Sequence, residues 1–252
     1  MKALITGATS GLGLAMAEIL SNQGWELILT GRNSAVLKEL QSRLKTNVYT
    51  VTCDLSKPEN AYKLYNACKK HSIDLLINNA GFGVFGYFSE TSLKSELEMI
   101  NVNITSLHIL TKLFLKDFLK RNSGRILNVA SSAGFMTGPK LSGYYASKNY
   151  VVRLSLAIAE ELRHMKTNVK ISVFCPGPID TNFNNRAGVK FSIKPKSAEY
   201  MAKYALEKTF ENKPLIIPTF FMKVCVYLSR IAPERMLSPV VFIIQNNKLK
   251  KK

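Results

Sequence analysis

The sequence contains few of the residues that form disulfide bonds or bind metal ions in small proteins. Its 252 residues include one tryptophan and three scattered histidines, and its four cysteines are Cys53, Cys68, Cys175 and Cys225. No two cysteines have C-x-x-C spacing, so we expect neither a disulfide framework nor a metal site. Free thiols are typical of a reducing compartment. The first expected strand starts at residue 3 and leaves no room for a signal peptide, so we expect a cytoplasmic protein.

Acidic residues are scarce as well. The chain has 17 Asp and Glu against 35 Lys and Arg, which gives a formal net charge of +18. Such an excess suits a nucleic-acid or anionic-membrane partner, and it also attracts an anionic cofactor. No nucleic-acid-binding signature accompanies the charge, so we expect no nucleic-acid partner. Hydrophobic residues make up 46% of the chain and charged residues 21%, the composition of a globular domain with a core of good size.

A glycine-rich turn, TGATSGLG at residues 6–13, separates the first expected strand from the first expected helix. Its spacing is G-x-x-x-G-x-G. A strand, a glycine turn and a helix in this order present backbone N–H groups and a positive helix end to a pyrophosphate. Any tight turn needs glycine, but this position in the chain favours a dinucleotide site.

The next expected strand, residues 25–30, ends at Thr30 and is followed by Arg32. A site specific for NAD usually has a carboxylate at this strand end, which holds the ribose hydroxyls. A guanidinium can bind a 2′-phosphate through two hydrogen bonds, whereas a carboxylate would repel it. We therefore expect NADP(H) to be preferred over NAD(H), with an ordinary turn arginine as the alternative for Arg32.

Helical and strand patterns alternate along the rest of the chain. Expected helices cover residues 34–44, 59–70, 95–120, 144–164 and 197–210, and further expected strands cover 48–52, 74–77, 169–174 and 215–218. Repeated βα units with buried strands predict an α/β fold, a single-domain Rossmann-type doubly wound parallel sheet with helices on both faces. Residues 182–196 have weak periodicity and are interpreted as a mobile loop, a plausible lid.

The helix expected at residues 95–120 carries apolar residues on most faces and should be largely buried. Asn103 is a polar residue inside it that needs a reason. A satisfied structural hydrogen bond would be one reason, and a role in catalysis would be another.

Ser131, Tyr144 and Lys148 follow an expected apolar strand that ends in small residues. Tyr144 and Lys148 are four residues apart, so they share one face of a helix. A nearby cation lowers the pKa of a phenol, so Tyr144 could act as acid or base while Ser131 holds a carbonyl oxygen. The same spacing recurs at Tyr65 and Tyr204, where a solvated helix face explains it and no such strand precedes it.

Together these motifs resemble those of the short-chain dehydrogenase/reductase family over residues 1–218. The glycine turn is similar to the family's cofactor turn, residues 78–81 (NNAG) to its sheet-stabilising motif, and residues 176–177 (PG) to its segment near nicotinamide. The resemblance implies the catalytic residues Asn103, Ser131, Tyr144 and Lys148. Tyr144 would exchange a proton with the substrate oxygen that Ser131 orients. Lys148 would hold the nicotinamide ribose and lower the Tyr144 pKa, and Asn103 would position a water.

The expected cofactor site combines these motifs with Arg32 and with Asp54, whose carboxylate could accept a hydrogen bond from the adenine amino group. Its residues are Gly7, Thr9, Ser10, Gly11, Leu12, Gly13, Arg32, Asp54, Leu55, Asn79, Ala80, Gly81, Tyr144, Lys148, Pro176, Gly177, Ile179 and Thr181.

We therefore expect an NADP(H)-dependent oxidoreductase that interconverts a hydrophobic ketone or aldehyde and its alcohol. The resemblance also implies a homo-oligomer, a dimer or tetramer formed through the long helices. A non-catalytic dinucleotide-sensing or scaffold protein on the same fold is the alternative, and it would be expected to lose part of the catalytic set. An apolar substrate is suggested by loop residues Phe82, Val84, Phe85, Phe135, Met136, Phe183 and Phe191.

Residues 219–252 depart from the family pattern and form a basic amphipathic extension. This segment has seven Lys or Arg against one acidic residue, with apolar residues between them. Neither apolar run reaches the 18 or so residues that a bilayer span requires. The extension could close the substrate pocket, complete an oligomer, or attach the protein weakly and peripherally to an anionic membrane.

Overall fold

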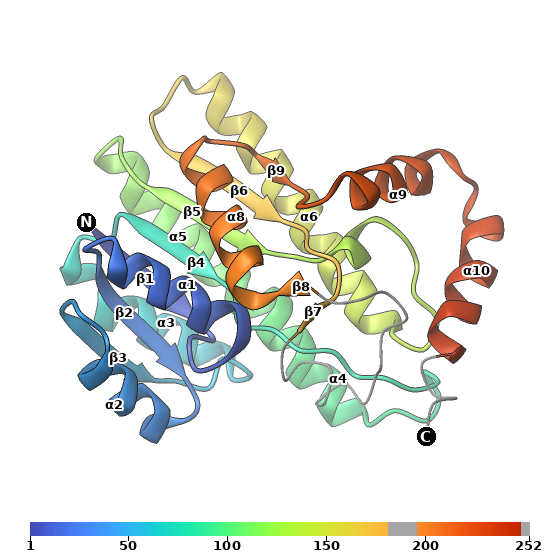
Figure 1. Cartoon of the computed structure of the whole chain (residues 1–252), viewed down its shortest axis with the longest axis horizontal. Coiled ribbons are helices and arrows are strands. Elements are labelled where there is room, and N and C mark those ends of the chain that lie inside the picture. Colours follow the sequence, from blue (N-terminus) through green and yellow to red (C-terminus); the bar gives the residue numbers. More distant parts are fainter. Residues whose placement is uncertain (181–195, 248–252) are drawn as a thin grey trace.

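A parallel sheet of seven strands in the order β3-β2-β1-β4-β5-β6-β9 runs through the molecule (Figure 1). The computed structural model describes residues 1–180 and 196–247. The strands are β1 (Lys2–Thr6), β2 (Glu26–Gly31), β3 (Val48–Thr52), β4 (Leu75–Asn78), β5 (Arg125–Val129), β6 (Lys170–Phe174) and β9 (Leu215–Ile216). Nearly every residue of β1, β4, β5 and β6 is buried, which explains why these strands are continuous apolar runs without alternation.

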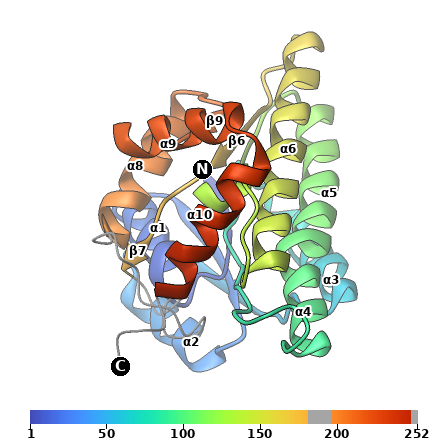
Figure 2. The same ribbon diagram turned by 90° about the vertical axis from the view of Figure 1, so that its right-hand side faces the viewer.

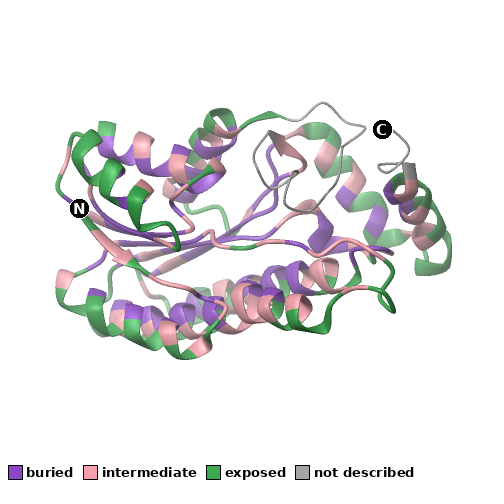
Figure 3. Cartoon of the chain, turned by 90° about the horizontal axis from the view of Figure 1, so that it is seen from below, coloured by how far each residue is buried: buried purple, intermediate pink, exposed green. Residues whose placement is uncertain are grey.

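Helices cover both faces of the sheet, as the alternating pattern predicts (Figure 3). One face carries α1 (Gly11–Asn22), α2 (Ser34–Arg43) and α8 (Ala198–Phe210). The other carries α3 (Pro58–Cys68), α5 (Leu107–Lys120) and α6 (Ser142–His164). The doubly wound arrangement is therefore confirmed.

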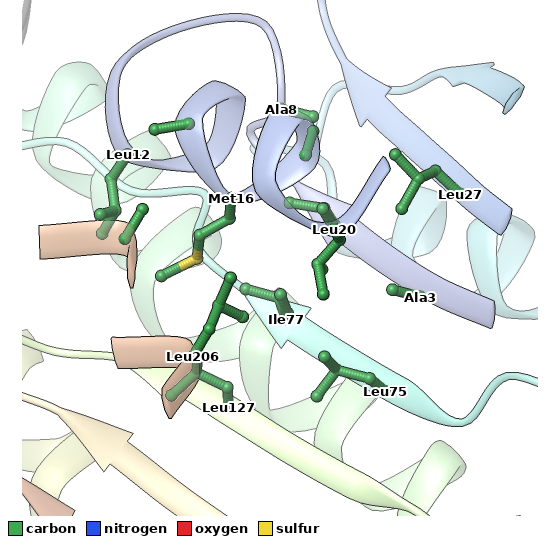
Figure 4. Packing of buried hydrophobic residues seen from close by; sticks show 14 of the residues in the cluster. Ala3, Ala8, Leu12, Met16, Leu20, Leu27, Leu75, Ile77, Leu127 and Leu206 are labelled. Atoms are coloured by element: carbon green, nitrogen blue, oxygen red, sulfur yellow. The ribbon is translucent and has the colours of Figure 1, made fainter. Parts of the chain in front are cut away.

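The core of the first face shows how the sheet and its helices interlock. Met16 and Leu20 of α1 and Leu206 of α8 pack on Ile77 of β4 and Leu127 of β5 (Figure 4). All five side chains are at most 2% exposed. This packing fixes the start of α1 relative to the ends of the central strands, where the strand order reverses between β1 and β4. In open α/β sheets, ligands bind in the crevice at such a reversal.

The helix expected at residues 95–120 is helical throughout but is not one regular α-helix. It consists of α4 (Leu93–Ile100), a π-helical segment η2 (Asn101–Ser106), and α5. It is also less buried than expected, because Leu97 and Ile100 of α4 are exposed. A single π turn inside a helix is frequent at functional sites, and this one holds Asn103.

The chain beyond β9 forms two helices, α9 (Phe220–Ile231) and α10 (Glu234–Asn247). Both lie at the end of the molecule to which the carboxyl ends of the strands point (Figures 1 and 2). Among the helices in the described ranges, none is both long enough and apolar enough to cross a bilayer. Two short strands, β7 (Ile179–Asp180) and β8 (Lys196–Ser197), pair in parallel beside the main sheet. The loop expected at residues 182–196 lies almost wholly outside the described residues.

Candidate active site

A cavity of about 430 Å³ opens beyond the carboxyl ends of β1, β2, β4 and β5. Its volume is in the range of small-molecule and cofactor pockets. Most of the expected cofactor and catalytic residues line it: Gly7, Thr9, Ser10, Gly11, Leu12, Arg32, Asp54, Leu55, Asn79, Ala80, Gly81, Ser131, Tyr144, Lys148, Pro176, Gly177 and Ile179. Gly13 and Asn103 lie behind the lining, and Thr181 lies outside the described residues.

The glycine turn is built so closely that only glycine fits at two of its positions. Gly7 has a φ of +65°, and a Cβ there would lie 2.9 Å from the Cα of Ala80. A Cβ on Gly13 would lie 2.4 Å from the Gly7 carbonyl oxygen. Asn79 Nδ2 fixes the turn by donating to the carbonyl oxygens of Thr6 at 3.0 Å and Gly7 at 3.1 Å. The motif at residues 78–81 therefore supports the cofactor turn.

The amino end of α1 faces the cavity and suits an anion. Ser10 is its N-cap, yet the Ser10 side chain makes no capping hydrogen bond, and the first turn contains no acidic residue. Residues 9–12 all line the cavity. Backbone N–H groups at such an end carry a partial positive charge, so these residues fit the pyrophosphate of a dinucleotide.

Two charged residues mark the far part of the cavity. Arg32 is exposed and lines the wall with Gly31 and Asn33, just past the end of β2. Asp54 also lines it, and its Oδ1 accepts a hydrogen bond of 3.1 Å from the Ser56 N–H. Asp54 is the only acidic residue of the described lining, and it follows β3 rather than β2, the strand whose end carries the carboxylate of an NAD-specific site.

Ser131, Tyr144 and Lys148 come together at the opposite part of the cavity. Ser131 caps the short 3-10 helix η3 (Ser132–Phe135), and its hydroxyl forms a hydrogen bond with the Tyr144 phenol. Lys148 is buried, and its Nζ donates to the Val129 carbonyl oxygen at 2.9 Å. A Cβ on Gly83 would lie 3.2 Å from the Tyr144 ring, so the chain after β4 packs directly on the phenol.

The pKa of Tyr144 is shifted in the opposite direction from the one expected. Burial raises it to about 12, and the hydrogen bond with Ser131 only partly opposes that effect. Burial also lowers the pKa of Lys148 to about 8. The predicted lowering of the Tyr144 pKa by Lys148 is therefore wrong for the protein by itself, because burial penalises the charged forms of both groups.

Asn103 has every part of its side-chain amide engaged in the structure. Its Oδ1 accepts from the Phe82 N–H at 3.1 Å, and its Nδ2 donates to the Phe82 carbonyl at 2.9 Å and to Ser147 Oγ at 3.0 Å. Ser147 directly precedes Lys148, so this network joins the π segment to α6 and to the loop after β4. The structural hydrogen bond considered from the sequence is present, and the role of Asn103 in holding a water stays a prediction.

A second polar network lies beneath the site and starts from Asn78, in the motif that resembles the family's sheet-stabilising one. Asn78 Nδ2 donates to Asn128 Oδ1 at 2.9 Å, and Asn128 Nδ2 donates to Ser155 Oγ at 3.0 Å. All three side chains are buried. The network ties β4, β5 and α6 together, and so sets the position of the strand ends that carry the site. The available signal for its other strand was Asn128, a polar residue one position before the end of β5.

The C-terminal helices supply a wall of the cavity that no motif indicated. Met222 of α9 and Ile244 and Gln245 of α10 line it, together with Tyr145. Gln245 Nε2 donates to the Tyr145 hydroxyl at 2.7 Å. Three roles were considered for residues 219–252, and the structure directly supports one of them, closure of the pocket.

Five of the loop residues proposed for an apolar substrate lie in the described part of the chain, and one of these five faces the cavity. Phe82 lines it, whereas Val84, Phe85, Phe135 and Met136 do not. Phe135 is buried against α9 instead, with the Arg230 guanidinium 5.2 Å from its ring centre. Phe183 and Phe191 lie outside the described residues. Across residues 1–180 and 196–247, no three His, Cys, Asp or Glu side chains come together as a metal site would require.

Comparison with known proteins gives consistent results. The family model for short chain dehydrogenases matches residues 1–190. An uncharacterised oxidoreductase of Staphylococcus saprophyticus is 33% identical over 214 residues, which is 82% of this chain and 91% of the relative. A short-chain dehydrogenase from Sphingobium yanoikuyae, solved with NADPH, superposes with a TM-score of 0.80 at 26% identity, covering 87% of this chain and 88% of its own. A short-chain dehydrogenase/reductase from Burkholderia phymatum, solved with NAD, gives 0.81 at 26% identity, covering 90% and 92%.

Proposed function

This chain belongs to the short-chain dehydrogenase family, and on that basis we propose that it interconverts a hydrophobic ketone or aldehyde and its alcohol with NADP(H) as cofactor. It is an oxidoreductase of the NAD(P)-dependent dehydrogenase/reductase type. The substrate class, the NADP(H) preference and the roles of individual residues are our proposal.

One observation carries the proposal. A single cavity is lined at one part by the glycine turn and the amino end of α1, and at the other by Ser131, Tyr144 and Lys148. The first part suits a pyrophosphate, and the second offers a proton donor beside a hydrogen-bonding hydroxyl. A non-catalytic dinucleotide sensor would not need the second part, so its presence favours an enzyme.

The residues would share the chemistry as follows. Nicotinamide supplies or accepts the hydride when bound. Tyr144 would donate its proton to the carbonyl oxygen in reduction and recover it in oxidation. A pKa of about 12 keeps Tyr144 protonated at neutral pH, so the phenol carries the proton that reduction requires. Ser131 would hold the substrate oxygen beside the phenol, and Lys148 would bind ribose hydroxyls through its buried ammonium.

The preference for NADP(H) is supported by Arg32. Its guanidinium lies beside the cavity at the end of β2, where an NAD-specific site would carry a carboxylate. Thr30, Gly31 and Asn33 complete this part of the lining and are all neutral. The related structures include one with NADPH and one with NAD, so the preference has to come from these residues of this chain.

The apolar character of the substrate is supported by the side chains near Tyr144. The lining there includes Phe82, Leu141, Tyr145, Met222 and Ile244. The Gln245 amide and the Tyr145 hydroxyl are polar groups of this wall, and they are hydrogen-bonded to each other. A substrate with a large apolar body and one carbonyl would match this lining.

A homo-oligomer is part of the proposal. Leu93, Leu97 and Ile100 are exposed at spacings of four and three residues along α4, so they form one apolar stripe. A stripe of this kind is a candidate subunit contact, and light scattering of the purified protein would test it.

The enzymatic proposal is tested with a panel of ketones and aldehydes of increasing apolar size, each supplied with NADPH or NADH. Cofactor absorbance gives the rate. We expect kcat/KM to rise with apolar size and to be higher with NADPH. No turnover of any carbonyl, together with tight NADPH binding, would support the non-catalytic alternative instead.

A further inference from the structure

The outward side of α9 is apolar from end to end. Phe220, Val224, Tyr227 and Ile231 are spaced four, three and four residues apart, so they form one stripe along the helix. All four are exposed, and Phe220 and Ile231 are 82% and 81% exposed. The opposite side is packed, since Val226 lies in a buried cluster with Phe135 and Ile217. The helix is therefore apolar on two sides, and only its inner side is covered within the described chain.

The next helix repeats this arrangement. Met236, Val240 and Ile243 of α10 are spaced four and three residues apart, and each is more than half exposed. The inner side of α10 makes polar contacts, Thr137 with Glu234 and Ser238, Lys140 with Asn246, and Tyr145 with Gln245, and Val241 of this helix is buried. The two outward stripes follow each other in the chain, and together we call them the α9–α10 face.

Basic residues accompany the face. Lys223, Arg230 and Arg235 are exposed on the two helices. Glu234 is the only acidic residue between 219 and 252, and it already accepts a hydrogen bond of 2.9 Å from Thr137. The sequence adds four lysines directly after α10, at positions 248 and 250–252. An exposed apolar surface with a surplus of cations needs a partner that is both apolar and negatively charged.

A second copy of this chain would meet only half of that need. A two-fold interface brings the same patch of both subunits together, so Lys223, Arg230 and Arg235 of each subunit would meet their equivalents with only Glu234 to offset them. An anionic bilayer offers an apolar interior below a negatively charged surface, which is what interfacial amphipathic helices bind. We propose that the α9–α10 face docks reversibly on a membrane surface rich in anionic phospholipid.

Docking would place the substrate cavity beside the lipid. Met222 of α9 and Ile244 of α10 line the cavity, and Ile244 is also 47% exposed. The helices that touch the bilayer are therefore the helices that form one wall of the pocket. This part rests on the proposed function, and it specifies the substrate as a lipophilic carbonyl compound that partitions into membranes.

The test is co-sedimentation of the full-length protein with vesicles of phosphatidylcholine and phosphatidylserine, compared with phosphatidylcholine alone, at low and high salt. We expect binding to the mixed vesicles at low salt and its loss at high salt. Phe220→Ser with Ile231→Ser should abolish binding, while Tyr62→Ser with Met165→Ser, which changes exposed apolar residues elsewhere, should not. Lys223→Gln with Arg235→Gln should weaken partitioning about 30-fold, since each basic residue contributes about 5-fold at an anionic surface. The matched pair Lys112→Gln with Lys116→Gln on α5 should leave it nearly unchanged.

Activity separates this proposal from the enzymatic one. With a small water-soluble ketone, the Phe220→Ser, Ile231→Ser variant should turn over as the wild type does, whereas with a long-chain ketone dissolved in the mixed vesicles its rate should fall. Vesicle binding without turnover of any carbonyl would leave the docking intact and refute the enzymatic proposal. Failure to sediment with anionic vesicles at low salt would overturn the docking. So would equal sedimentation of the face variant, or a dimer that the face substitutions dissociate.

Discussion

Lys148 Nζ lies 5.8 Å from the centre of the Tyr144 ring and donates its hydrogen bond to the carbonyl of Val129. The two other Tyr-x-x-x-Lys pairs have nearly the same geometry, with Lys69 5.9 Å from the Tyr65 ring and Lys208 5.8 Å from the Tyr204 ring. Helical spacing alone therefore sets this distance. What distinguishes Lys148 is that it is buried at a strand end beside the cavity, whereas Lys69 is exposed and Lys208 is bonded to Glu211.

Replacing Tyr144 with Phe should lower kcat by roughly 100- to 10,000-fold, the usual contribution of a positioned general acid. NADPH affinity should stay within a few-fold, because the phenol is needed for proton transfer and not for holding the cofactor. Stopped-flow or steady-state rates and a fluorescence titration measure the two quantities. Tyr204→Phe and Tyr65→Phe are the controls and should keep full turnover. Wild-type kcat in Tyr144→Phe would remove the phenol from the mechanism.

The buried ammonium of Lys148 should make stability depend on pH in a defined direction. Its pKa is lowered from 10.5 to about 8 in the folded protein, so between these values the unfolded chain binds the extra proton. The contribution of Lys148 to stability is therefore least favourable below pH 8 and improves as pH rises toward 10.5. The Tm of Lys148→Met relative to wild type should accordingly be higher at pH 7 than at pH 10. Loss of the hydrogen bond to Val129 shifts the Tm of the variant equally at both pH values. The diagnostic quantity is therefore the change, between pH 7 and pH 10, in the Tm difference between the variant and the wild type. An unchanged difference would mean that the ammonium is not penalised by burial.

Removing the guanidinium of Arg32 should weaken NADPH binding and leave NADH nearly unaffected. A charge-assisted hydrogen bond to a phosphate contributes about 1.5–3 kcal/mol, so Arg32→Ala should raise the NADPH Kd by roughly 10- to 150-fold. Calorimetric titration with both cofactors measures this. Arg153→Ala, at an exposed arginine of α6 away from the cavity, is the control. Equal weakening of both cofactors would show that Arg32 does not read the 2′-phosphate.

The bond between Gln245 and Tyr145 should couple α10 to the substrate end of the pocket. Gln245→Leu and Tyr145→Phe should each cost about 0.5–1.5 kcal/mol of stability, and the double variant less than their sum, because one hydrogen bond is lost in all three. Both should also raise the KM for large ketones with little effect on NADPH affinity. Urea denaturation and steady-state kinetics of the wild type, the two single variants and the double variant complete this double-mutant cycle. Strict additivity would contradict a direct coupling.

The sequence predicted the parts of the site that depend on local backbone geometry. Gly7 has a positive φ, and a side chain at position 13 would collide with the Gly7 carbonyl oxygen. Both positions of the turn therefore require glycine. The alternation of strand and helix patterns likewise predicted the parallel sheet, because its central strands are buried on both faces. Tyr144 and Lys148 could be placed on one helix face from their spacing alone.

Other features depend on contacts between distant segments and have no local signature. The direction of the Tyr144 pKa shift depends on how deeply the phenol is buried, and spacing from Lys148 does not report that. Gln245 reaches Tyr145 across 100 residues of chain. Asn103, in the π-helical segment, accepts a hydrogen bond from Phe82 on a distant segment. Each of these required the packed structure.

The wall formed by α9 and α10 is also the part of the described pocket lining that is synthesised last. Strands β1 to β6 precede it, and amino-terminal parts of a chain begin to fold during synthesis. A nascent chain that has reached residue 178 already contains the glycine turn, Ser131, Tyr144 and Lys148, but not Met222, Ile244 or Gln245. Translation thus delivers the residues proposed to hold the dinucleotide before the residues of α9 and α10 that are proposed to contact the substrate. A chain terminated between residue 178 and α9 would contain the residues proposed to hold a cofactor, but its pocket would be open to solvent.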